Sequence, residues 1–345
     1  MPKPLNVTMP LAVAMPAMPC LRAGVVLAAP LAVLLVGLPA STVHAQQKYP
    51  TRAIRLVLPF PPGGSTDIVA RVVTQRLAET WGQPVLVDNR PGAAGNLAAE
   101  IVARAAPDGY TLFQVNVAHA IAASLFPKLG YSLERDFVAV TQLASTPYAL
   151  VAHPGVPAKS VRDLVALARA RPGVLNYASA GNGSATHLSG ELIRALGRVD
   201  LLHVPYKGSG PAVAALMSGE VDVYFLAVPA AAPLVKAGRL RVLGVSGAKR
   251  SSMMPEVPTM AEGGLAGFDT STWHGVMAPA ATPREVVAQL AGELVRILAA
   301  PDIRGKLESQ GLEPVGDSQA QFAAFIRSEI AKWEKLVRAS GAKPE

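Results

Sequence analysis

The segment IRLVLPFPPGGSTDIVARVVTQRL, residues 54–77, decides how the chain folds. Its first part, residues 54–60, is a short run of aliphatic and aromatic residues, as expected for a buried strand. A turn rich in proline and glycine follows. Beyond the turn, apolar residues recur at helical spacing, at Ile68, Val69, Val72, Val73 and Leu77. The segment therefore predicts a strand, a glycine turn and a helix, the repeating unit of an α/β protein.

The same alternation continues along the chain. Helical spacing recurs around Leu164 and around Leu188, and long helices are expected at residues 284–298 and 319–339. Short runs rich in branched and aromatic residues lie between these helices and indicate strands. The candidate strands are residues 54–60, 85–89, 111–116, 149–153, 175–178, 201–205, 221–225 and 240–246. This pattern predicts α/β architecture with mainly parallel sheets.

These strands are more than one small sheet usually holds, so we expect two lobes. Residues 141–148 are expected to carry the chain from the first lobe to the second, and the Gly/Pro-rich residues 255–269 to carry it back. The first lobe would then comprise residues 46–147 and 271–345, and the second residues 148–270.

The first 45 residues have the pattern of a cleaved signal peptide. An uncharged apolar run, residues 23–38, follows Arg22, and the segment ends in the small-residue pattern Val43-x-Ala45. The alternative is a membrane anchor, but a spanning helix needs roughly 20 apolar residues, and this run is shorter and contains Pro30. We therefore expect export to the periplasm and cleavage after Ala45. The only cysteine, Cys20, would leave with the signal, so no disulfide is expected.

The chain has a formal net charge of +8, and its charges are scattered. A nucleic-acid-binding protein is expected to cluster lysine and arginine in one stripe, which this sequence does not do. A positive field attracts anionic ligands. Solubility alone explains the charge equally well.

Three strand-to-helix junctions are rich in glycine and small hydroxyl residues: residues 60–67 (FPPGGSTD), 179–187 (SAGNGSATH) and 205–211 (PYKGSGP). The first turn of a helix has unpaired N–H groups and a partial positive charge, and glycine lets a ligand approach the backbone closely. Each junction is therefore suited to an anion. A single junction of this kind is more often an ordinary turn, whereas three spread over two lobes suggest a clamp around one anion.

Some polar residues in these junctions have ordinary structural roles as alternatives. Ser65, Thr66 and Ser184 are natural N-caps. Asp67 lies in a first helical turn, where the helix dipole favours a carboxylate, and it would repel a ligand carboxylate placed nearby. The alternative for Asp67 is to hold an amine of the ligand.

Other candidate residues are equally open. His187 is either an anion donor or a buried structural donor, and Lys207 either pairs with a carboxylate or is a solvated loop residue. Asp222 either faces the cleft or ends a strand. Trp273 either lines a pocket or packs at the hinge.

Catalytic motifs are absent from the sequence. Gly208-Ser209-Gly210 lacks the flanking residues of a hydrolase nucleophile elbow, and neither a dinucleotide fingerprint nor a phosphate-binding Gly-Lys-Ser/Thr loop occurs. The histidines are few and dispersed, and no His-Glu-x-x-His motif is present. We therefore expect no enzyme activity, no cofactor and no metal.

Several motifs resemble the Bug family, the extracytoplasmic solute receptors of tripartite tricarboxylate transporters, and the resemblance covers essentially the whole mature chain. The motifs are Tyr49-Pro50-x-Arg52, residues 57–67, residues 87–95 (VDNRPGAAG), residues 106–112 (APDGYTL), residues 203–208 (HVPYKG), Val257-Pro258-Thr259-Met260 with Glu262, Trp273-x-Gly275, and Ala278-Pro279-Ala280-x-Thr282-Pro283. The resemblance implies a type II periplasmic-binding-protein fold, with two α/β lobes joined by a hinge.

The resemblance also implies which residues bind the ligand. One ligand carboxylate would be held by backbone groups near the first Pro-Gly-Gly loop, and the second-lobe loops would complete the clamp. The candidate ligand-binding residues are Pro62, Gly63, Gly64, Ser65, Thr66, Asp67, Ser179, Gly183, Ser184, His187, Tyr206, Lys207 and Gly208, to which we add Phe60 and Asp222. The run from Tyr224 to Val228 suggests an apolar distal pocket, so the number of acid groups on the ligand stays open.

The function expected from these observations is capture of a small organic carboxylate for the membrane subunits of a transporter, by a monomer that binds no nucleic acid. An alternative is a ligand sensor whose closed lobes dock on a sensor kinase. An exported enzyme is a third reading, and the missing catalytic motifs argue against it.

Overall fold

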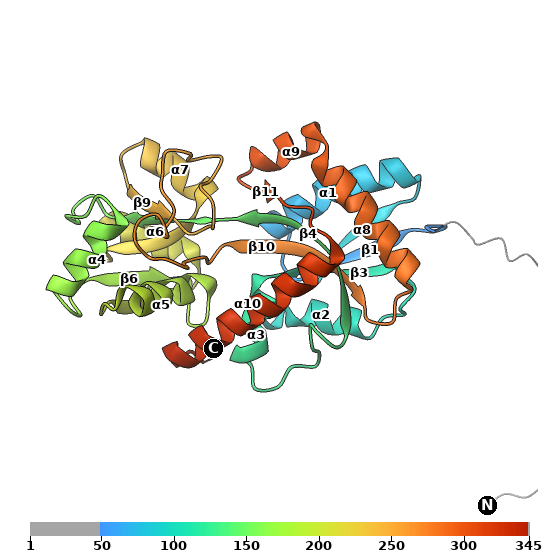
Figure 1. Cartoon of the computed structure of the whole chain (residues 1–345), viewed down its shortest axis with the longest axis horizontal. Coiled ribbons are helices and arrows are strands. Elements are labelled where there is room, and N and C mark those ends of the chain that lie inside the picture. The colour runs from blue at the N-terminus through green and yellow to red at the C-terminus, as the bar shows by residue number, and fades with distance from the viewer. Residues whose placement is uncertain (1–48, 344–345) are drawn as a thin grey trace, which may run out of the picture. The chain divides into compact units, whose positions relative to one another are not determined.

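The computed structural model describes residues 49–343, so the expected signal peptide lies outside the described residues. Two mixed sheets organise this part of the chain (Figure 1). The first has the strand order β11-β4-β10-β3-β1-β2. Its strands are β1 (Ile54–Leu58), β2 (Val85–Asn89), β3 (Thr111–Asn116), β4 (Phe137–Thr146), β10 (Thr272–Pro279) and β11 (Glu313–Pro314).

The second sheet has the order β7-β6-β8-β5-β9. It is formed by β5 (Tyr148–Ala152), β6 (Asn176–Ser179), β7 (Leu202–Pro205), β8 (Val223–Ala227) and β9 (Arg241–Val245). In the first sheet β1 pairs in parallel with β2 and β3, and in the second sheet β6 pairs in parallel with β7 and β8. The other pairings, in which β10, β11 and β5 take part, are antiparallel. The expectation of mainly parallel sheets was wrong, because β10 and β5 each lie between two strands that run in the opposite direction.

Helices cover both faces of each sheet. They are α1 (Ser65–Trp81), α2 (Asn96–Ala103), α3 (Val117–Leu125), α4 (Val161–Ala170), α5 (Ala185–Gly197), α6 (Ser209–Ser218), α7 (Val228–Lys236), α8 (Arg284–Ala299), α9 (Pro301–Glu308) and α10 (Gln319–Ser340). A short 3₁₀ turn, Ala93–Gly95, precedes α2. Within residues 49–343, no helix is both long and apolar enough to span a bilayer.

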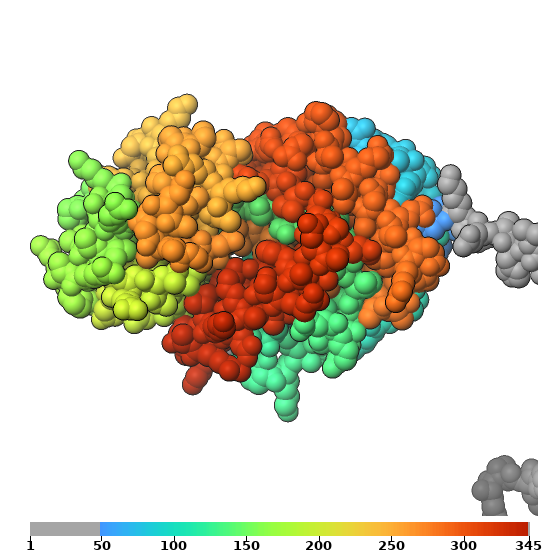
Figure 2. Space-filling model, in the orientation of Figure 1, coloured from blue at the N-terminus to red at the C-terminus, as the bar shows by residue number. Residues whose placement is uncertain are grey.

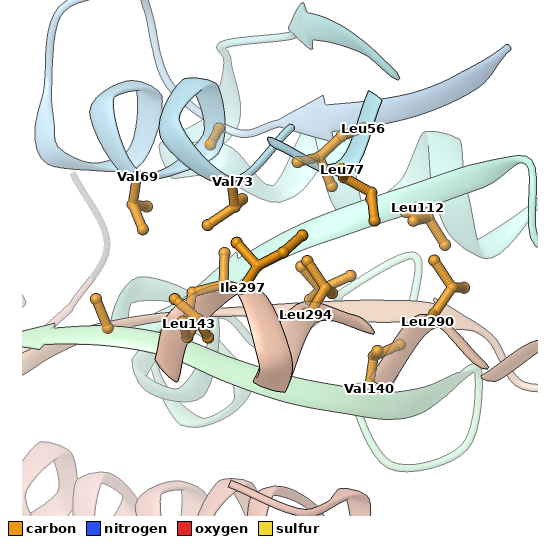
Figure 3. Close-up of a cluster of buried hydrophobic side chains, with 14 of the residues drawn as sticks. Leu56, Val69, Val73, Leu77, Leu112, Val140, Leu143, Leu290, Leu294 and Ile297 are labelled. Atoms are coloured by element: carbon orange, nitrogen blue, oxygen red, sulfur yellow. The ribbon is translucent and has the colours of Figure 1, made fainter. Parts of the chain in front are cut away.

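The apolar stripe predicted on α1 forms part of a buried core. Val69, Val73 and Leu77 pack against Leu294 and Ile297 of α8 over one face of the first sheet (Figure 3). Helices α2, α3 and α10 cover the other face. Figure 2 shows α10 lying across the molecule, and it packs against both α3 and α5. The second sheet is buried between two further apolar clusters.

The chain passes between the two sheets twice. The first crossing is a single residue, Pro147, between β4 and β5, and the return runs through residues 246–271 between β9 and β10. The first crossing was therefore predicted too broadly, because residues 141–146 belong to strand β4. The return includes the predicted residues 255–269. Neither β4 nor β10 was expected from the sequence, and both extend between the sheets in Figure 1.

Candidate functional site

The glycine-rich loops gather at the edges where the two sheets are joined. In the first sheet, β1 and β3 are parallel and end at the edge where β10 begins, because His274 of β10 pairs with Asn116 at the end of β3. In the second sheet, β6, β7 and β8 end at the edge where β5 begins, because Tyr148 pairs with Ala227. Loops from both sheets therefore flank the crossing segments, as expected for a clamp.

The first loop, residues 59–64, leads into α1 and is stabilised by side-chain hydrogen bonds of the protein itself. The Gly63 N–H donates to Oδ2 of Asp67 at 3.1 Å, and Nε of Arg71 donates to the same oxygen at 2.8 Å. Nδ2 of Asn89 donates to the Phe60 carbonyl at 2.9 Å and to Oδ1 of Asp67 at 3.3 Å. The bond from Arg71 is the largest cause that lowers the pKa of Asp67 below its usual range. In this structure the Asp67 carboxylate therefore stabilises the first loop through hydrogen bonds.

The N-terminus of α1 remains open toward solvent. Its N-cap residue, Gly64, offers no side-chain acceptor to the first-turn amides, and Pro62, Gly63 and Gly64 are exposed. Thr66 instead faces the sheet, because its carbonyl accepts from Nε2 of Gln114 at 2.9 Å. The first turn of α1 therefore presents backbone amides rather than charged side chains.

The second loop, residues 179–187, forms hydrogen bonds within itself. Oγ of Ser184 accepts the His187 N–H and caps α5, so the N-cap alternative for Ser184 describes this structure. The Gly183 N–H donates to Nδ1 of His187 at 3.0 Å, and Nε2 of His203 lies 2.7 Å from Oγ of Ser179. Hydrogen bonds with imidazole rings and hydroxyl groups therefore stabilise the backbone of the second loop.

The third loop, residues 205–210, leads into α6 and is again open. Its N-cap, Gly208, supplies no side-chain cap, while Lys207, Ser209 and Gly210 are exposed. The Gly208 N–H donates to the Ala180 carbonyl at 3.2 Å, which ties the third loop to the second. The Tyr206 hydroxyl donates to Glu220 at 2.8 Å, and burial, with Glu220, raises the pKa of Tyr206 to about 12.

Tyr224 of β8 supports the third loop, and it was not among the candidate site residues. Its hydroxyl donates to Oγ of Ser209, the first residue of α6, at 2.9 Å. The run after Asp222 is core rather than pocket wall, since Phe225 stacks on Phe268 and Leu226 packs with the cluster under α6 and α7. The structure therefore places this run in the core and does not support the apolar distal pocket suggested by the sequence.

Asp222 is the one predicted site residue that the structure places elsewhere. It precedes β8, and its Oδ2 accepts the N–H of Asn176, the first residue of β6, at 2.8 Å. The neighbouring strands β6 and β8 are parallel, so Asp222 lies at the edge of the second sheet opposite the glycine loops. The alternative role, ending a strand, describes its position.

A fourth loop, residues 92–95, joins the site and was missing from the candidate residues. Gly92, Ala93, Ala94 and Gly95 all have positive φ angles, which is unusual for the two alanines. The loop follows β2 and lies at the same edge as the first loop, and a Cβ on Gly95 would come within 2.9 Å of Pro59. The pair of glycines was the available sequence signal, but the left-handed alanines could not be inferred from residue type.

The two halves of the site touch through α3 and α5. A Cβ on Gly183 would lie 2.6 Å from Cδ2 of Leu125 at the end of α3, so a side chain there would displace Leu125. Leu188 of α5 belongs to the core cluster of α3 and α10.

A separate cavity of about 390 Å³ lies at the hinge beside Pro147, Gly247 and Trp273. Trp273, which the sequence placed either in a pocket or at the hinge, lines this cavity, whereas the predicted ligand-binding residues do not. Within residues 49–343, no cluster of three or more histidine, cysteine, aspartate or glutamate side chains is placed to bind a metal.

The arrangement of sheets and loops defines the class of protein. Two α/β lobes, joined at a hinge and carrying loops at the joined edges, form the type II periplasmic-binding-protein fold, as predicted. The family model described as the tripartite tricarboxylate transporter family receptor matches residues 69–342. The chain belongs to this receptor family, and the resemblance to the Bug family is confirmed.

Similar proteins match along most of their length. The chain is 39% identical over 310 residues to a Pseudomonas sp. (strain P51) protein from the tcbD-tcbE intergenic region, covering 89% of this chain and 92% of that one. It is 38% identical over 297 residues to BugT of Bordetella pertussis, with coverages of 86% and 91%.

Two solved structures are also similar. Rpa4515 of R. palustris, solved with adipate, gives a TM-score of 0.72 at 38% identity, covering 86% of this chain and 100% of that one. MatC of Rhodopseudomonas palustris, solved with bound malate, gives 0.68 at 37% identity, covering 84% and 100%.

Proposed function

We propose that this protein is a periplasmic receptor that captures a small organic carboxylate and delivers it to the membrane subunits of a tripartite-type transporter. Residues 1–45 would act as the export signal and be removed. The two lobes would comprise residues 46–147 with 271–345, and residues 148–270. Capture would follow closure of the lobes about the crossing segments.

One observation carries the proposal: α1 and α6 begin at the joined edges of different sheets, and neither has a side-chain cap. First-turn amides and the positive end of the helix dipole favour an anion at such a position. A carboxylate between the two helix ends would satisfy donors that the protein leaves open. The adipate and malate bound by similar receptors support this ligand class.

The proposed contacts divide between presenting and supporting residues. Pro62, Gly63, Gly64 and Ser65 would present the α1 end, and Tyr206, Lys207 and Gly208 the α6 end. The remaining candidates, Phe60, Thr66, Asp67, Ser179, Gly183, Ser184 and His187, would shape the loops around the ligand. Asp222 is left out of this set because it lies at the opposite edge.

We infer that the receptor holds its ligand unchanged and acts as a monomer. Two reactive side chains near the loops are engaged with neighbours: Asp67 with Gly63 and Arg71, and His187 with Gly183. A general base or nucleophile needs a free atom within reach of its substrate. Recovery of the bound ligand unchanged, and light scattering of the mature protein, would test the two statements.

Thermal-shift screening of the mature protein tests the proposed ligand class. The panel should contain monocarboxylates and dicarboxylates of increasing length, including adipate and malate, with neutral sugars, amines and divalent metals as controls. A ligand at 100 times its Kd raises the free energy of unfolding by about 2.7 kcal/mol, so a binding carboxylate raises Tm. Stabilisation by sugars or metals together with no response to any carboxylate would contradict the proposal.

A further inference from the structure

Three aromatic rings are stacked directly beneath the second loop. His187 of α5 and His203 of β7 lie face to face, with ring centroids 3.9 Å apart and an interplanar angle of 12°. Tyr177 of β6 stacks on the other side of His203 at 4.9 Å and 23°. The Tyr177 ring in turn lies so close to α5 that a Cβ on Gly190 would come within 2.0 Å of it. The stack is therefore fixed between the sheet and the helix.

Each imidazole holds a different part of the loop. Nδ1 of His187 accepts the Gly183 N–H at 3.0 Å. Nε2 of His203 contacts Oγ of Ser179 at 2.7 Å, and that hydroxyl also accepts the Gly181 N–H at 3.2 Å. The backbone from Ser179 to Gly183 thus depends on both rings.

These bonds require His187 to be neutral. A backbone N–H can only donate, so Nδ1 of His187 must be the unprotonated nitrogen, and its proton must lie on Nε2. Protonation would place a hydrogen on Nδ1 and break the bond to Gly183. A charged ring would also face a second imidazole at 3.9 Å in a buried place, where charge is costly.

The charged groups around the stack do not reverse this preference. Glu191 lies 4.0 Å from Nε2 of His187, but its carboxylate already accepts from Tyr177 at 2.6 Å and from Arg194 at 2.9 Å. On the other side of α5, helices α3 and α10 pack against it through apolar residues, including Leu188. Burial is the largest cause that lowers the pKa of both imidazoles, and it brings that of His203 to about 4.

We infer that His187 and His203 are positioning residues of this receptor. As a neutral stacked pair they hold residues 179–183 in the form that completes the ligand clamp, and protonation of His187 releases Gly183. The part of this inference that concerns ligand affinity rests on the proposed function. The part that concerns the loop does not.

NMR of the ligand-free mature protein, with ¹⁵N-labelled histidine and glycine, tests the loop. Imidazole and amide spectra are recorded from pH 8 to pH 4.5. We expect His187 to carry its proton on Nε2, and both rings to stay neutral well below the ordinary pKa of about 6.5. The Gly183 amide signal should move only as His187 becomes protonated. A proton on Nδ1 of His187 at neutral pH, midpoints near 6.5, or a Gly183 amide that ignores the protonation of His187 would each overturn the inference.

Two substitutions separate the ring from its hydrogen bond. His203→Phe keeps the stacked ring and loses the contact with Ser179, whereas His203→Gln keeps a polar group that can reach Ser179. The control is His153→Gln, because Nδ1 of His153 accepts the Gly155 N–H at the far edge of the second sheet. Adipate and malate are the probes in calorimetry at pH 7.5.

We expect His203→Phe to bind the probe roughly two- to twelvefold more weakly, the range of one net hydrogen bond. His203→Gln should recover most of the affinity, and His153→Gln should match the unsubstituted protein. Equal affinity in His203→Phe and the unsubstituted protein would overturn the positioning role. If the unsubstituted protein binds neither these probes nor any other carboxylate, the proposed function fails, while the NMR experiment still decides the role of the pair.

Discussion

Oδ2 of Asp67 accepts the backbone N–H of Gly63 at 3.1 Å, so the first glycine loop is fastened to the helix that it precedes. The same arrangement recurs in the second loop, where the Gly183 N–H donates to His187. In both loops a glycine that was expected to donate to the ligand donates inward instead. The helix starts without a side-chain cap are those of α1, after the first loop, and α6, after the third, whereas Ser184 caps α5.

Replacing Asp67 should destabilise the protein and weaken ligand binding. Asp67→Ala removes the acceptor of the Gly63 N–H and one of the two acceptors of the Asn89 amide, and each lost hydrogen bond costs about 0.5–1.5 kcal/mol. Asp67→Asn keeps an acceptor for Gly63 and should cost less. Urea unfolding and calorimetry with adipate or malate measure both effects. If both variants were as stable as the unsubstituted protein, the hydrogen bonds of Asp67 would contribute nothing to the free energy of unfolding.

The pH dependence at Asp67 follows from the direction of its pKa shift. Its folded-state pKa is lowered, chiefly by the bond from Arg71, so the contribution to stability is present above the unfolded value of about 3.9. It is lost as the pH falls through the lower folded value. Arg71→Gln should remove most of this acid dependence. An acid-unfolding profile unchanged by that substitution would contradict the assignment.

Two buried histidines, His119 and His274, and the half-buried His203 should control stability at mildly acidic pH. Burial lowers the pKa of His119, His203 and His274 to about 4. The unfolded chain binds protons below about 6.5 while the folded chain does not, so stability is fully present above 6.5 and is lost as the pH falls toward 4. Each fully buried histidine adds a slope of up to about 1.4 kcal/mol per pH unit.

Urea unfolding at pH 8, 7, 6 and 5 measures this slope. His274→Gln should reduce it by about one histidine's share, since His274 is fully buried and its Nε2 has no hydrogen-bond partner. Replacement of His153, which is only partly buried, serves as the control. A flat profile between pH 6.5 and 5 would contradict the assignment.

Removing the Tyr224 hydroxyl should separate ligand binding from stability. Tyr224→Phe loses the bond to Ser209 that ties β8 to the start of α6, at a cost of about 0.5–1.5 kcal/mol in the free energy of unfolding. The matched control is Tyr49→Phe, which loses a 2.7 Å bond to the Gly109 carbonyl outside the proposed site. Both should lower Tm, but only Tyr224→Phe should also weaken ligand binding. Identical affinities in the two variants would contradict the supporting role of Tyr224.

The sequence indicated the parts of the fold that obey local rules. The glycine turn before α1 and the apolar stripe at Val69, Val73 and Leu77 were identified because each depends on neighbours close in the chain. Strand β4 was missed because it is buried along nearly its whole length and has no alternating pattern. Strand β10 was missed because its role, linking the sheets, is set by partners far away in sequence.

The same limit applies to the site. The loops were located correctly as features of the chain, but the direction in which each polar group points depends on tertiary partners such as Asn89, Gln114 and His203. Asp222 was predicted at the wrong edge of the second sheet. The sequence of a strand does not indicate which of its ends lies near the glycine loops, because this depends on the sheet topology.

The most direct test of carboxylate binding at the N-terminus of α1 is to place an aspartate side chain there. Gly64 has φ −84° and ψ 174°, which any residue can adopt, and a Cβ there meets nothing within 4 Å. In Gly64→Asp the carboxylate would cap α1 and occupy the position proposed for the ligand. Gly64→Ala adds the Cβ without charge, and Gly292→Asp adds the same charge at an open position of α8.

Calorimetry of these three variants with the best-binding carboxylate is the deciding measurement. We expect Gly64→Asp to be at least as stable as the unsubstituted protein, yet to bind the ligand at least about tenfold more weakly, a difference of about 1.4 kcal/mol. Gly64→Ala and Gly292→Asp should bind nearly as well as the unsubstituted protein. Undiminished binding by Gly64→Asp would contradict the claim that the open end of α1 holds the ligand's carboxylate.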